Sequence, residues 1–178
     1  RLCDGLLQGQ FHLKEAPRSP AFYALAFPDI LISYTNAAAT SLVVPADTGW
    51  VIEQAALGLS DDAAQPGLRF SQLPMQCLGW IEAGRGVYLD ARDTEGWLRE
   101  WRFEPAGHGR VRIRCLHLLP QRGTVPPLTI SLGGFEGGWY ELAQIYRRWS
   151  LQAPWAARGP DERRGSSMAD IACWAWNR

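Results

Sequence analysis

The hydrophobic pattern of the chain changes at one stretch, GFEGGWYELAQIYRRWSLQAP, which covers residues 134–154. Before it, apolar residues tend to alternate with polar ones, whereas here they recur every three or four residues, as on one side of a helix. The spacing predicts a helix of about three to four turns. Its apolar side is expected to carry Trp139, Leu142, Ala143, Tyr146 and Trp149, and its polar side Glu141, Gln144, Arg147 and Arg148.

The two ends of this segment have the chemistry of helix termini. Glu136 and Glu141 place negative charge near the predicted N-terminus, and Arg147 and Arg148 place positive charge near the C-terminus. Pro154 cannot continue a helix and is expected to end it.

Two interpretations of this helix remain open. Its aromatic side can pack against a sheet of the same domain, which would bury a large apolar area. Alternatively, the helix joins two domains, because the polar segment 156–167 and the apolar run MADIACWAWNR, residues 168–178, follow it. A near-continuous apolar run is typical of a strand that is buried on both faces, as in a parallel sheet or a barrel.

The residues before the helix predict many short antiparallel strands. In residues 110–118, Val111, Ile113 and Cys115 alternate with polar positions and are expected to point inward. Candidate strands cover residues 6–13, 21–27, 30–35, 41–44, 50–56, 73–82, 86–91, 97–103, 110–118 and 128–132. Pro28 and Asp29 separate the second from the third, and residues 83–85 form a hairpin turn. Turns at such intervals favour a mainly β fold, a large antiparallel β-sandwich.

Composition and charge exclude several classes of function. The 178 residues carry no net charge, which gives no electrostatic basis for binding nucleic acid, and no apolar run approaches the 18 residues of a membrane span. Glycines 133, 134, 137 and 138 lack the Lys-Ser/Thr of a phosphate-binding loop, so no cofactor is expected. The chain begins with Arg1, and we interpret it as a piece of a longer protein of unknown compartment.

The four cysteines do not predict a metal site. They are widely spaced, without a CxxC pair or a histidine at ligand spacing, and the sequence leaves open whether any pair forms a disulfide. They are Cys3, Cys77, Cys115 and Cys173.

Three stretches resemble one family of glycoside-hydrolase-like bacterial proteins, in which a large N-terminal β-sandwich precedes a (β/α)8 barrel. They are MQCLGWIEAGRGVYLDARD (75–93), GGWYELAQIYRRWSLQAPW (137–155) and IACWAWNR (171–178). The family pattern G-[VL]-Y-L-x-x-x-D is matched by Gly86, Val87, Tyr88, Leu89 and Asp93. The pattern W-Y-x-x-A-x-x-Y-R-x-W is matched by Trp139, Tyr140, Ala143, Tyr146, Arg147 and Trp149. The resemblance covers roughly the C-terminal 110 residues, and the helix pattern is its most specific part.

The resemblance implies a galactose-mutarotase-like sandwich over residues 1–135, a linker helix over 136–155, and a linker with the first barrel strand over 156–178. It also implies that the parent protein acts on carbohydrate. The catalytic carboxylates would lie on later barrel strands, outside this chain, so no catalytic residue is expected here. The barrel of the same polypeptide and a carbohydrate are the expected partners, without nucleic acid or membrane.

The candidate substrate-binding residues follow from the same resemblance. Trp176, Asn177 and Arg178 would lie at the C-terminal end of the first barrel strand, with Trp176 stacking on a sugar ring and the other two donating to hydroxyls. Arg178 can also serve only as a cap or an interdomain ion pair. Asp93, grouped with Asp90 and Glu95, either reaches the mouth of the barrel or builds a turn by bonding nearby backbone.

Two other functions remain open. The chain can be a stand-alone carbohydrate-binding module with a row of exposed tryptophans such as Trp80, Trp97 or Trp101. The nine tryptophans of the sequence can instead fill a large β core, which is the interpretation we favour. The chain can also be a structural domain whose aromatic helix face forms an oligomer interface.

Overall fold

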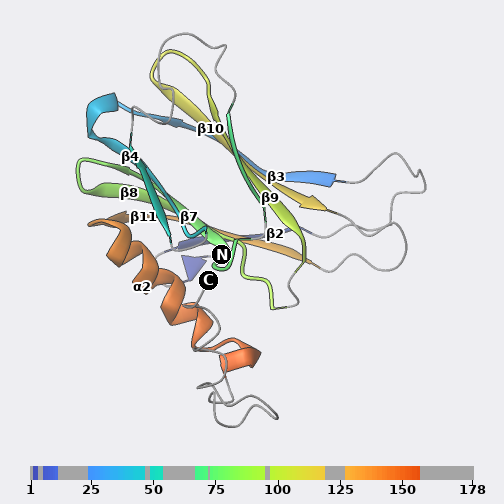
Figure 1. Cartoon of the computed structure of the whole chain (residues 1–178). Coiled ribbons are helices and arrows are strands. Elements are labelled where there is room, and N and C mark those ends of the chain that lie inside the picture. Colours follow the sequence, from blue (N-terminus) through green and yellow to red (C-terminus); the bar gives the residue numbers. More distant parts are fainter. Residues whose placement is uncertain are drawn as a thin grey trace, which may run out of the picture.

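The computed structural model describes residues 2–3, 6–11, 24–46, 49–53, 67–71, 73–94, 97–118 and 127–156. The described residues form two antiparallel sheets and one α-helix (Figure 1). The larger sheet has the order β1 (Leu2–Cys3), β2 (Leu6–Phe11), β11 (Leu128–Glu136), β8 (Arg85–Asp90), β7 (Cys77–Glu82), β4 (Thr40–Val44) and β5 (Trp50–Glu53). The smaller sheet has the order β3 (Ala24–Ser33), β10 (Arg110–Leu118), β9 (Arg99–Pro105) and β6 (Leu68–Ser71). Short 3-10 turns cover Ala37–Ala39 (η1) and Pro154–Ala156 (η2).

The two sheets pack face to face around one apolar core, as in a β-sandwich, which confirms the mainly β prediction. Trp80 of the larger sheet stacks on Phe103 of the smaller one, with ring centroids 5.5 Å apart and an interplanar angle of 23°. Leu42 and Leu89 reach the same core from the larger sheet, and Ile113 reaches it from the smaller sheet. The core therefore draws on strands that are far apart in the sequence.

Helix α2 (Trp139–Ser150) covers the outer face of the larger sheet (Figure 1). Residues that alternate with the core positions along β4, β7 and β8 meet the buried side of α2 and form a second apolar cluster. Its buried members are Val43, Cys77, Ile81, Tyr88, Leu142, Ile145 and Tyr146. The central strands of the larger sheet are thus covered on both faces.

The hairpin predicted within residues 73–91 is confirmed. β7 and β8 pair from Cys77 opposite Asp90 to Glu82 opposite Arg85. The turn is one residue shorter than expected, because Arg85 already belongs to β8. Ala83 and Gly84 both have positive φ, 49° and 77°, as the tight two-residue hairpin turn requires.

The strands of the smaller sheet keep the predicted alternation with one correction. Val111, Ile113 and Cys115 are buried as expected, and His117 continues the series. The break expected at Pro28 is absent, because β3 runs from Ala24 to Ser33 through a cis Phe27–Pro28 bond. Among the described strands, β3 pairs only with β10, and an edge strand tolerates a proline because one side of its backbone makes no ladder bonds.

The predicted helix is confirmed, but its buried side is rotated from the expected one. Leu142 and Tyr146 are buried as expected, while Ile145 replaces Trp139, whose side chain is 58% exposed. The preceding strand is also longer than predicted, because β11 continues to Glu136. Trp139 is the first helical residue, and a helical side chain leans toward the N-terminus, so its indole projects past the cluster beneath the helix.

Candidate functional site

The predicted substrate-binding residues fall in two regions. Trp176, Asn177 and Arg178, like the predicted barrel strand, lie outside the described residues. Asp93 is described and lies in the loop that leaves β8. Asp93 is therefore the one predicted substrate-binding residue within the described part of the chain.

Asp93 ties its own loop together. Its Oδ2 accepts a hydrogen bond from the backbone N–H of Trp97 at 2.5 Å. The Gln76 side chain clamps the backbone of Asp93, since its Oε1 accepts from Asp93 N at 3.1 Å and its Nε2 donates to Asp93 O at 3.0 Å. The same Oδ2 lies 2.8 Å from Arg99 Nη2 of β9, in the other sheet. These contacts hold the carboxylate within the loop and against Arg99.

Arg99 extends this ion pair into a buried network. Its Nε donates to Nδ1 of His117, its cross-strand neighbour, at 3.2 Å, and its Nη1 donates to Trp97 O at 3.1 Å. With Nδ1 accepting, His117 carries its proton on Nε2, which donates to Phe27 O at 2.6 Å. Burial lowers the pKa of His117 to about 4, because a charged imidazole would lack hydration at this site. The cationic guanidinium of Arg99 beside the ring lowers the pKa further.

The tryptophans proposed for a binding row do not form one. Trp80 and Trp101 are each 2% exposed and belong to the core between the sheets, which overturns that expectation. Trp97 is partly buried in the loop fixed by Asp93. Both buried indoles lie on core-facing strand positions, where alternation alone could not separate core from binding surface.

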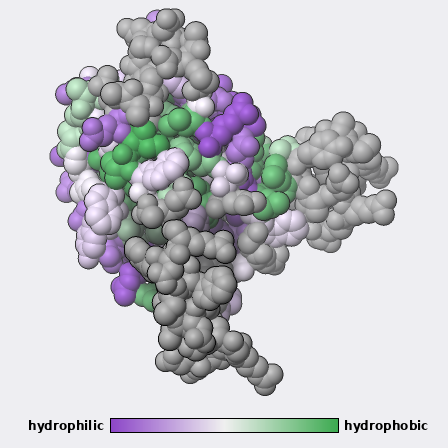
Figure 2. All heavy atoms as spheres, in the orientation of Figure 1, coloured by the Kyte–Doolittle hydropathy of each residue, from purple (hydrophilic) through white to green (hydrophobic). Residues whose placement is uncertain are grey.

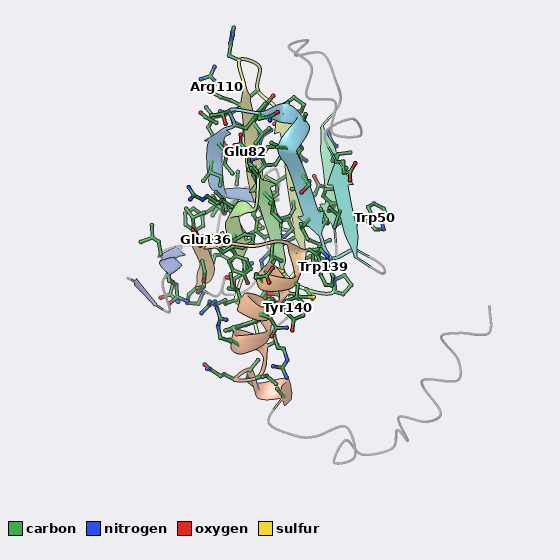
Figure 3. The ribbon with its side chains drawn as sticks, turned by 90° about the vertical axis from the view of Figure 1, so that its left-hand side faces the viewer. Trp50, Glu82, Arg110, Glu136, Trp139 and Tyr140 are labelled. Atoms are coloured by element: carbon green, nitrogen blue, oxygen red, sulfur yellow. The ribbon has the colours of Figure 1, made fainter. Side chains whose placement is uncertain are left out.

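Exposed aromatic residues instead gather where α2 begins beside β5. We call Trp50, Val51, Trp139 and Tyr140 the aromatic surface; each side chain is between 45% and 58% exposed. Trp139 and Tyr140 make an edge-to-face contact with ring centroids 5.9 Å apart. Trp50 lines the same groove as Trp139, but its ring meets Phe70 of the smaller sheet edge to face, with centroids 6.3 Å apart. Figure 3 shows Trp139 and Tyr140 close together on α2 and Trp50 at the edge of the larger sheet.

A groove of about 310 Å³ lies within the aromatic surface. Trp50 and Val51 of β5 line one part of it, and Trp139 and Leu142 of α2 line another, with Met75 also contributing. The face turned toward the viewer in Figure 2 carries a patch of apolar side chains bordered by hydrophilic ones. A contiguous apolar groove of this kind is typical of a surface that binds another molecule or another domain.

The start of α2 is fixed rigidly enough to position these rings. Glu141 Oε2 accepts from the backbone N–H of Gly138 at 2.8 Å, which caps the first turn and lowers the pKa of Glu141. Below the helix, Leu142 fills the space over Gly79, where a Cβ would overlap its Cδ1. Trp139 and Tyr140 of the aromatic surface therefore sit on an ordered helix and not on a loop.

The sequence did not identify a second polar feature, the fully buried Asp90. Asp90 Oδ2 accepts from the Tyr88 hydroxyl at 2.7 Å and lies 3.1 Å from Arg92 Nε. Cys77 and Ser131, both fully buried, flank it on the neighbouring strands in one row across the sheet. Period-two counting from the buried Tyr88 would have placed Asp90 under α2, but an aspartate at a strand end suggested a turn.

Burial and partners together set the protonation of this row. Burial raises the pKa of Asp90, while the Tyr88 hydroxyl and Arg92 oppose the shift. The Ser131 hydroxyl also favours the ionised form, although neither Ser131 Oγ nor Asp90 Oδ1 completes a well-formed hydrogen bond among the described residues. Burial likewise raises the pKa of the Cys77 thiol, which is free and remains protonated.

The other described carboxylates mostly have structural partners. Glu104 pairs with Arg114, Glu100 with Arg102, Asp29 with Arg112 and Glu136 with Arg85. Glu82 accepts three hydrogen bonds from Thr35 and Asn36. Among the described residues, no group of three or more His, Cys, Asp or Glu could hold a metal ion. Of the helices within that part of the chain, none is both long and apolar enough to cross a membrane.

No family model matches the sequence, and no curated protein matches it.

Proposed function

We propose that this chain is the non-catalytic sandwich domain of a carbohydrate-active enzyme, of galactose-mutarotase-like type, and that it supports a barrel that follows it in the same polypeptide. The aromatic surface carries the proposal. Its residues Trp139 and Tyr140 lie on α2, the last long element before residues 157–167 of the polar segment and the apolar run 168–178. A barrel that begins with that run would start within reach of the surface, since eleven extended residues span about 36 Å.

Two physical arguments support docking at this surface. Tryptophan and tyrosine are enriched at the buried centres of interfaces, where each removes a large apolar area from water. Nearly all the described carboxylates have structural partners, which suits a supporting domain whose catalytic acids lie elsewhere.

The first test is to read and express the gene beyond Arg178. We expect about 250 further residues in which strand and helix patterns alternate. Two carboxylates should face the inside of the barrel, and only the long protein should hydrolyse aryl glycosides. A stop codon soon after Arg178 would overturn the proposal.

The second test addresses the docking surface directly. Trp139→Ala in the long protein is expected to lower the midpoint of thermal unfolding, while the same change in the 178-residue chain has little effect. Leu31→Ala is the matched control, because Leu31 is an exposed apolar residue of the smaller sheet. Equal shifts from the two substitutions in the long protein would argue against docking at α2.

Carbohydrate binding at the groove is the second candidate function, because exposed indoles flank a groove of about 310 Å³. Calorimetry of the 178-residue chain with cello-, malto- and xylo-oligosaccharides tests it. Binding that Trp139→Ala abolishes and Leu31→Ala spares would favour this function over docking. Concentration-dependent dimerisation in sedimentation experiments, lost in Trp139→Ala, would instead identify the surface as an oligomer interface.

A further inference from the structure

A separate pocket lies between the sheets at the β7–β8 turn. It has a volume of about 580 Å³. Ile32 at the end of β3 and Thr35, two residues after that strand, line one side. The β7–β8 hairpin contributes Trp80, Glu82, Arg85 and Val87. None of its lining residues lines the groove at α2. Figure 3 shows Glu82 well away from Trp139 and Tyr140. A ligand here would be independent of the docking surface.

Glu82 presents a fixed acceptor to this pocket. Its Oε1 accepts from Thr35 N at 2.8 Å, from Thr35 Oγ1 at 2.5 Å and from Asn36 N at 2.7 Å. These donors lower the pKa of Glu82, so the carboxylate is ionised at neutral pH. Its Oε2 has no hydrogen-bond partner within the described part of the chain. One oxygen therefore anchors the side chain while the other keeps its lone pairs for a ligand.

Arg85 supplies donors next to this acceptor. It lies directly opposite Glu82 on the neighbouring strand, and its Nε is 3.9 Å from Oε1 of Glu136, its neighbour on the other side. The Arg85 and Glu136 side chains are both more than 80% exposed, so this pair is weak and leaves most guanidinium N–H groups available. Glu82 and Arg85 thus contribute one negative and one positive charge to the pocket lining.

The remaining walls are apolar. Ile32 and Val87 contribute aliphatic surface, and Trp80 contributes indole surface at the boundary with the core. Trp80 Nε1 is buried and has no acceptor among the described residues. Unpaired buried polar groups are uncommon in folded proteins, and those that occur are often found at functional sites.

We propose that this pocket binds a neutral polyhydroxylated ligand of the size of one or two sugar rings. A ligand hydroxyl donates to Glu82 Oε2, a neighbouring oxygen accepts from the Arg85 guanidinium, and C–H groups contact Ile32 and Val87. A simple anion is repelled by Glu82 and a simple cation by Arg85, whereas a sugar uses both groups. The volume lies within the range of about 300–1,000 Å³ found for small-molecule sites. The inference goes beyond the supporting role and does not depend on a barrel.

Amide chemical shifts of the 178-residue protein, titrated with D-glucose, D-galactose, D-mannose and xylobiose, test the proposal. We expect saturable shifts with at least one of these sugars at the amides of residues 35 and 82–87. Glu82→Gln is the sharpest variant, because its amide oxygen can still accept from Thr35 and Asn36 while a donor replaces Oε2. It should weaken binding at least about tenfold.

Glu53→Gln is the matched control, because Glu53 is an exposed glutamate of β5 in the same sheet and does not line the pocket, and it should leave affinity unchanged. Arg85→Met is the second variant and should also weaken binding, which keeps the proposal testable if Glu82→Gln fails to fold. The absence of saturable shifts with every sugar would overturn it, as would unaltered binding in the folded variants. Glycine, included as a zwitterion, would overturn it by binding more tightly than the sugars.

Discussion

Asp93 Oδ2 lies 2.8 Å from Arg99 Nη2, and this ion pair joins the loop that leaves the larger sheet to the first residue of β9 in the smaller sheet. The side chains are only 10% and 7% exposed, so water screens neither charge well. The pair therefore fixes one end of the sandwich and leads into the buried His117 through Arg99.

Asp93→Ala should lower the free energy of unfolding by about 3 kcal/mol, because it leaves the buried Arg99 guanidinium without its counter-charge. Asp29→Asn is the control, since the Asp29–Arg112 pair is about half exposed and should contribute less than about 1 kcal/mol. Urea denaturation at neutral pH measures both. Similar losses for the two substitutions would contradict a special role for the Asp93–Arg99 pair.

His117 should make the protein lose stability in mild acid. Its pKa is about 4 in the fold and 6.5 when exposed, so between these values the unfolded chain binds more protons than the folded one. The neutral His117 therefore contributes about 3 kcal/mol to the free energy of unfolding above pH 6.5, and this contribution is lost as pH falls toward 4. The raised pKa of Asp90 makes stability change with pH in the opposite direction. The wild type must therefore be compared with His117→Gln, whose stability should lack the loss in mild acid that His117 causes. An NMR titration midpoint of His117 near 6.5 would refute the prediction.

Tyr88→Phe should destabilise the fold by about 1–3 kcal/mol at neutral pH, because the carboxylate of Asp90 loses its hydroxyl donor in a buried site. The cost should fall at low pH, since that hydrogen bond stabilises the ionised form of Asp90. Denaturant melts at two pH values measure the difference. Tyr140→Phe, at an exposed position of α2, serves as control and should change stability by less than about 0.5 kcal/mol. A pH-independent cost at position 88 would show that the hydroxyl does not act through Asp90.

Leu142→Ala should cost about 2–5 kcal/mol, because its side chain fills the space between α2 and β7. Gly79→Ala should also destabilise, since the new Cβ would overlap Leu142 Cδ1 and push the helix from the sheet. The double variant should lose less than the sum of the two, because the shorter side chain makes room for the added methyl. Strict additivity in thermal or denaturant unfolding would indicate that the two positions do not meet.

Much of the β architecture could be predicted because its signals are local. The alternation of Val111, Ile113 and Cys115 reports one buried strand face without reference to any partner. The β7–β8 hairpin was visible because a glycine turn separates two apolar runs. The candidate site was less accessible to such reasoning. Period-two patterns distinguish the two faces of a strand but not a core face from a binding face, so the sequence left both a core position and a binding position open for Trp80 and Trp101.

By itself, the sequence determined that residues 24–136 are rich in antiparallel strands and that the helix after them has Glu141 in its first turn and Arg147 and Arg148 in its last. These features follow from side-chain periodicity and local hydrogen bonding, which act over a few residues. Only the tertiary structure decided that β11 lies between β2 and β8, which places Ser131 beside Asp90, and that α2 buries Ile145 while exposing Trp139. Such choices depend on packing between segments tens of residues apart, and no local pattern encodes which of several similar apolar faces will meet.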